Sequence, residues 1–140
     1  MNTHDAKREK NSLQTLELGP HATLRLASFK PHSDNELVAE LRIHAPGGRN
    51  DDQWQDRYAG IEDYVYAEIE GLGRAQSKTI DLVTAPKADA IICHLRFSLG
   101  DDHITAILAG AEFGFGVDDD RMRVGARVKR ALLDTLLSRL

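Results

Sequence analysis

The sequence predicts an α+β domain in which an antiparallel sheet of five or six strands carries two helices, in the order βββαβββα. Two observations support this fold class. Several short stretches alternate strictly between apolar and polar residues, as half-buried strands do, and two longer stretches repeat apolar residues at helical spacing. With 140 residues, of which 41% are hydrophobic, the chain can fill one core, so we expect a single domain over residues 13–140. Residues 1–12 are rich in charge and poor in apolar side chains, and we expect them to form a disordered tail.

Three strands are expected before residue 45. Leu16 and Leu18 alternate with polar neighbours, and Leu24 and Leu26 continue the alternation after the turn signal at Gly19-Pro20, which indicates a hairpin. The third strand, residues 36–44, has the strictest alternation in the chain. Its apolar face holds Leu37, Ala39, Leu41 and Ile43, and its polar face holds Glu36, Glu40, Arg42 and His44.

A helix is expected from Trp54 to Leu72. The run Asn50-Asp51-Asp52 can cap its first turn, and a stripe at helical spacing is formed by Ile61, Tyr64, Val65, Ile69 and Leu72. A competing interpretation makes residues 64–70 a strand, because Val65, Ala67 and Ile69 also alternate with polar or aromatic neighbours. Gly60 disfavours the helix, and the sequence leaves both interpretations open.

The second half repeats the order of the first. Strands are expected over residues 78–84 and 89–99, and the fifth strand is predicted to form a hairpin through Gly100-Asp101-Asp102 with a sixth strand over residues 103–115. Glycines 110, 114 and 116 indicate a bulge or bend in that sixth strand. A final helix is expected to begin at Asp118-Asp119-Asp120 and run to Leu140. Its apolar stripe is formed by Val124, Val128, Leu132, Leu136 and Leu140.

Composition narrows the classes of function. The net charge of -4 and the pI near 5.8 disfavour binding to nucleic acid or to anionic membranes. One cysteine excludes an internal disulfide, and we find neither a spanning helix nor the apolar region of a signal peptide, so we expect a cytoplasmic protein. The sequence leaves homo-oligomerisation open.

Motifs for chemistry are missing from the sequence. There is no phosphate loop and no nucleophile elbow, and Cys93 falls on an apolar strand face where its thiol would be inert. His94 follows Cys93 directly, so on a strand the two side chains point to opposite faces and cannot bind one ion. We therefore predict no metal site, no cofactor and no catalytic residue.

Two surfaces are candidates for binding. An acidic and aromatic stretch after residue 50 could dock a basic protein partner, through Trp54, Asp56, Tyr58, Glu62 and Asp63. If the third and fifth strands share a sheet, its polar face offers an alternative ligand site, made of Arg42, His44, His94 and Arg96.

The sequence therefore predicts a noncatalytic protein-binding module. A small acidic protein of this profile would suit an inhibitor or immunity-type protein that neutralises a basic partner. The alternative is a small-molecule-binding or enzymatic domain with a pocket between the sheet and a helix.

Overall fold

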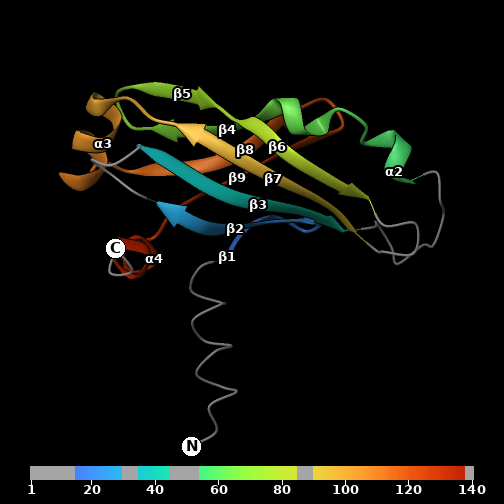
Figure 1. The fold of residues 1–140 in the computed structure, drawn as a ribbon, viewed down its shortest axis with the longest axis horizontal. Helices are drawn as coiled ribbons and strands as arrows, with labels where there is room; N and C mark the ends of the chain where they lie inside the picture. The colour runs from blue at the N-terminus through green and yellow to red at the C-terminus, as the bar shows by residue number, and fades with distance from the viewer. Residues whose placement is uncertain (1–14, 30–34, 45–53, 85–89, 138–140) are drawn as a thin grey trace, which may run out of the picture.

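The computed structural model describes residues 15–29, 35–44, 54–84 and 90–137, which form two antiparallel sheets and three short helices (Figure 1). In spatial order, sheet A consists of β1 (Thr15–Gly19), β2 (Ala22–Phe29), β3 (Glu36–His44), β7 (Ala90–Ser98) and β6 (Lys78–Thr84). Sheet B consists of β5 (Gly73–Gln76), β4 (Val65–Ile69), β8 (Phe113–Asp119) and β9 (Met122–Arg127). The helices are α2 (Trp54–Arg57), α3 (Asp101–Leu108) and α4 (Arg130–Leu137), with a 3₁₀ turn η2 (Ile61–Tyr64).

The core lies between the two sheets. β3 and β7 pair along their whole length, from Glu36 opposite Ser98 to His44 opposite Ala90, and every second residue of each strand is buried. Sheet B turns its own buried residues toward them, and the rings of Phe97 and Phe115 meet edge to face with centroids 5.1 Å apart. Burying an aliphatic or aromatic side chain of this size contributes roughly 1.5–3 kcal/mol before entropy, so this layer is the main source of stability.

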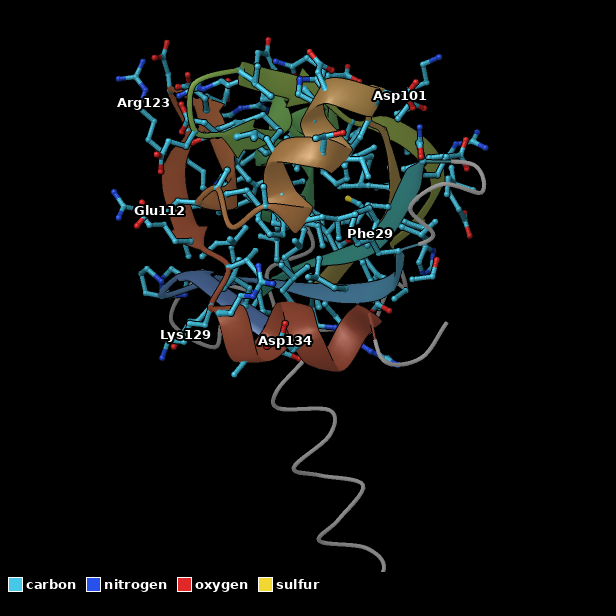
Figure 2. The ribbon with its side chains drawn as sticks, turned by 90° about the vertical axis from the view of Figure 1, so that its left-hand side faces the viewer. Phe29, Asp101, Glu112, Arg123, Lys129 and Asp134 are labelled. Carbon is cyan, nitrogen blue, oxygen red and sulfur yellow. The ribbon has the colours of Figure 1, made fainter. Side chains whose placement is uncertain are left out.

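The sheets approach each other on both sides. β1 lies beside β9, where Gly19 faces the Val124 side chain, and β5 runs through Ser77 directly into β6, so the chain passes from one sheet to the other there. Figure 2 shows α3 across one end of the space between the sheets, and its buried residues are Ile104 and Ile107. α4 packs against β2.

The strand predictions for sheet A are confirmed. The hairpin of β1 and β2 forms, β3 and β6 have the predicted bounds, and β7 differs from its prediction by one residue at each end. The predicted α+β class is also correct, but the fold is mostly β and its strands form two sheets and not one.

The helix predicted from Trp54 to Leu72 is wrong. Only Trp54–Arg57 and the turn Ile61–Tyr64 are helical, and the competing strand interpretation describes β4. A positive φ angle at Gly60 breaks the predicted helix in its interior and another at Gly71 breaks it near its end, and Val65, Ala67 and Ile69 gain burial by facing the core from a strand.

The sixth strand predicted over residues 103–115 is wrong in its first part, and so is the hairpin at Gly100. Residues 101–108 form α3, and the chain reverses at Gly110, where φ is 104°. A run that is apolar on both faces fits a buried helix as well as a buried strand, so periodicity alone could not distinguish them. The glycines at 114 and 116 lie within β8 and not at its end.

The helix predicted from Asp118 to Leu140 is also wrong over its first half. β8 continues to Asp119, a turn follows, and β9 occupies Met122–Arg127 before α4 begins at Arg130. The expected order βββαβββα is therefore not observed. Residues four apart share a face in a strand as well as in a helix, which is why Val124 and Val128 fitted a helical stripe.

Other predictions lie outside what the structure describes: the tail of residues 1–12, the cap at Asn50-Asp51-Asp52, and the side chains of Trp54 and Leu136.

Cys93 is fully buried on the core side of β7, and burial, with a smaller effect of Glu62, raises the pKa of its thiol to about 12. Because the thiolate is the reactive species, we expect Cys93 to resist a thiol reagent such as DTNB in the native protein and to react once denaturant is added. Rapid stoichiometric labelling without denaturant would contradict the described packing.

Leu133 is a buried residue of α4. Leu133→Asp should place an unpaired carboxylate against the core, and we expect it to remove several of the roughly 5–15 kcal/mol that hold a domain folded. Lys129→Asp, which adds the same carboxylate at an exposed position just before α4, is the control. Equal urea midpoints for the two variants would show that α4 is not docked in solution.

Candidate functional site

Four basic residues singled out from the sequence lie together on the outer face of sheet A. β3 and β7 are neighbours, so Arg42, His44, His94 and Arg96 share the side opposite the core. Most of these groups already have acidic neighbours. Arg42 pairs with Glu40 at 3.1 Å and Arg96 with Glu36 at 3.6 Å, while the two ring nitrogens of His94 lie 3.8 Å from Glu40 and 3.5 Å from Asp81.

The four residues do not surround one cavity. Arg42 and His44 line a depression of about 270 Å³ together with Thr15, Thr23, Arg25 and Glu40, and His94 and Arg96 lie outside it. The depression is on the exposed face of the sheet and not between a sheet and a helix. Ion pairs at such exposed positions contribute little, so this face resembles an ordinary solvated sheet surface.

A larger concavity, which the sequence did not suggest, crosses the outer face of sheet B. It measures about 520 Å³, and glycines of β8 and β9 form its floor. Its rim carries Glu68, Glu70 and Glu112 together with Arg127, which pairs with Glu112 at 2.9 Å. Figure 2 shows Glu112 and Arg123 extending outward from this side of the molecule.

Packing explains the glycines in and beside this concavity. A Cβ on Gly116 would overlap the Tyr66 hydroxyl, and a Cβ on Gly114 would overlap the Ala126 carbonyl. The guanidinium carbon of Arg74 lies 3.9 Å from the centroid of the Tyr66 ring, and Arg74 pairs with Asp118 at 2.7 Å. The Tyr66 ring therefore lies between the Gly116 backbone and the Arg74 guanidinium, and the concavity lies beside this ring. The only sequence signal was the spacing of the glycines, which also fits a bent strand.

The acidic stretch of the sequence forms α2 and η2, and η2 packs against β6 (Figure 1). Asp56 and Asp63 are exposed and Glu62 is half-buried. Tyr58 packs against the core, whereas Tyr64 keeps 46% of its surface exposed. We call Asp56, Glu62 and Asp63 the acidic segment.

Arg121 holds the acidic segment in place. From the turn between β8 and β9, it donates hydrogen bonds to the carbonyls of Arg57 at 3.1 Å and of Ala59 at 2.7 Å, and its Nε bonds Asp119 at 2.7 Å. The hydrogen bond from Arg121 lowers the pKa of Asp119, and the same bond raises the pKa of Arg121. The carboxylate therefore stays charged as the pH falls toward the usual aspartate value, and the anchoring contact persists with it.

The carboxylates of the acidic segment form no ion pair with a described residue, and among the other described carboxylates the same holds for Glu17, Glu70, Asp101 and Asp102. The others lie beside an arginine or, for Asp81, beside His94: Glu36, Glu40, Glu68, Asp81, Glu112, Asp118, Asp119, Asp120 and Asp134. Two cations lie nearby: Arg57 follows Asp56 in α2, and Arg121, which pairs with Asp119, also interacts electrostatically with Glu62. The segment consequently retains a net negative charge at a fixed position.

Within the described ranges, no group of three or more His, Cys, Asp or Glu residues is arranged to hold a metal ion. The described helices are also too short, or not apolar enough, to cross a membrane.

Comparison with known proteins shows a fold but no function. No protein-family model matches the sequence, and no curated protein does. The chain is similar in structure to a protein of unknown function from Burkholderia pseudomallei, with a TM-score of 0.76 and 19% sequence identity over 98% of this chain and 89% of that one. At this identity the likeness extends to the fold alone.

Arg121→Ala should release the segment between Arg57 and Ala59 from the β8–β9 turn while leaving the two sheets intact. We expect faster hydrogen exchange at the amides of Ala59, Ile61 and Asp63, with unchanged exchange in β3 and β7, because local openings follow the loss of local contacts. Arg123→Ala, in the same hairpin but without these carbonyl contacts, is the control. Equal exchange in both variants would show that Arg121 does not hold the segment.

Proposed function

We propose that this protein is a noncatalytic binding module that holds a basic protein partner through the acidic segment. The observation that carries the proposal is the contrast in pairing: most carboxylates elsewhere on the described surface pair with an arginine, and Asp101 and Asp102 accept hydrogen bonds at the start of α3, whereas no ion pair or hydrogen bond joins the carboxylate of Asp56, Glu62 or Asp63 to a described residue. An unpaired group of like charges raises the local potential and attracts an oppositely charged surface.

The surroundings of the segment favour a protein partner. Tyr64 is a half-exposed aromatic residue next to Asp63, and exposed aromatic residues are enriched in interfaces because they bury a large area at a low entropy cost. Arg121 limits the motion of the backbone between α2 and η2, so less order has to be gained on binding.

An inhibitor or immunity-type role fits these features, since such a protein needs a charged, preformed surface and no chemistry of its own. The chain's one cysteine is its strongest intrinsic nucleophile, and its burial withholds it from reaction. A ligand site on the outer face of sheet A is less well supported, because Arg42, His94 and Arg96 are already paired there and line no common cavity.

Charge reversal tests the proposal. Asp56→Lys combined with Asp63→Lys should slow association with a partner captured from the native host and reduce the salt dependence of its rate, because the variant loses charges that attract a basic surface. Both residues are exposed, so the fold should survive. Stopped-flow association at several salt concentrations provides the measurement.

The matched control is Glu17→Lys with Glu70→Lys, which changes the net charge equally at two exposed positions on β1 and after β4. Equal association rates for the two double variants would refute a role for the acidic segment. A loss confined to a variant with alanine at Arg42, His44, His94 and Arg96 would transfer the site to sheet A.

A further inference from the structure

Resting on the proposed function, we infer that the basic partner binds by adding a β-strand to the free edge of β6. β6 is the last strand of sheet A and is seven residues long. Within the described chain, backbone hydrogen bonds join it to β7 and to no other element. In an antiparallel pair about half of an edge strand's residues direct their N–H and C=O groups away from the neighbour, so β6 presents unpaired main-chain groups.

The other edge of sheet A is not comparable. β1 lies beside β9, and Gly19 packs so closely on Val124 that a side chain there would displace it. At the β6 side, sheet B ends with β5, which itself continues into β6 through Ser77. β6 is therefore the long open edge among the described strands.

The side chains of β6 also remain exposed. Ile80 keeps 52% of its surface exposed and Leu82 keeps 45%, although Leu82 pairs with Cys93 and so lies on the core side of the sheet. Natural edge strands are usually protected by charges, bulges or a covering segment. β6 has an irregularity between Thr79 and Asp81, but the residues after it, Asp81 to Thr84, pair regularly with β7, so this stretch is the one suited to accept a strand.

Charge selects the occupant of this edge. η2 packs against β6, and the Ser77 hydroxyl donates a hydrogen bond to the Glu62 carbonyl at 3.4 Å, which places Glu62 and Asp63 of the acidic segment beside the start of the open edge. A second copy of this chain carries the same net charge of -4 and the same acidic segment, so like-charge repulsion disfavours it as the occupant. In a strand that alternates apolar and basic residues, the apolar ones would contact Leu82 on the core side, and the basic ones would lie on the outer face near Asp81, while the acidic segment attracts the cations as the strand approaches.

The test uses a blocked peptide of about ten alternating valine and lysine residues, a length that matches an ordinary strand. We expect saturable binding by fluorescence anisotropy, together with new protection from hydrogen exchange at outward-facing amides within Asp81–Thr84. The same peptide N-methylated along both edges cannot form the main-chain ladder and should bind at least about tenfold more weakly.

Leu82→Lys should weaken binding by about tenfold because it removes an apolar contact and adds a like charge. Leu72→Lys is the control, since Leu72 is also an exposed leucine, 40% accessible, but lies in the β4–β5 turn. Its effect should stay below about twofold.

The outcomes separate this inference from the proposed function. Binding that depends on Asp56 and Asp63 but leaves the β6 amides unprotected would overturn strand addition and leave the acidic site standing. If the peptide protects the β6 amides equally in the native protein and in the Asp56→Lys, Asp63→Lys variant, strand addition would be supported and the acidic site refuted. Absence of saturable binding at millimolar peptide, equal binding of the N-methylated peptide, or protection of β6 by self-association alone would each overturn the inference.

Discussion

Phe97 of β7 and Phe115 of β8 meet edge to face in the layer between the sheets, and both rings are almost completely buried. To supply its part of this layer, β8 must direct Phe113, Phe115 and Val117 inward, so the residues between them face outward. The same register brings the β8–β9 turn to the side of the molecule where Arg121 reaches the backbone of the acidic segment.

The unequal sizes of the sheets determine which surfaces stay open. Sheet A has five strands and sheet B has four, and the chain crosses between them at Ser77, where β5 becomes β6. Among the described strands, none pairs with the outer edge of β6, and the exposure of Ile80 and Leu82 follows from this geometry. The chain runs from η2 directly into β4 of sheet B, and η2 packs against β6. The residues of η2 in the acidic segment and the open edge therefore belong to one surface.

Charges outside the core have two different roles on this protein. On sheet A they pair across neighbouring strands in solvent, where screening limits each pair to a small contribution. In the acidic segment they form no ion pair with a described residue, so an oppositely charged surface would be attracted over about a Debye length. Affinity would then come from the main chain and apolar side chains of β6, which act only at contact.

The sequence by itself determined the strands whose two faces differ. β3 and β6 have the predicted bounds, and the burial of Cys93 followed from its place on the apolar face of β7. When only one face of a strand is buried, alternation of apolar and polar residues identifies the strand and its inward face. The helices were misassigned where periods of two and 3.6 coincide: at Val65 to Ile69, at residues 101–108, and again at Met122 to Arg127. The acidic residues were visible in the sequence, but their lack of partners was not, since pairing depends on which strands become neighbours. The open edge of β6 likewise arose only when the chain divided its strands between two sheets.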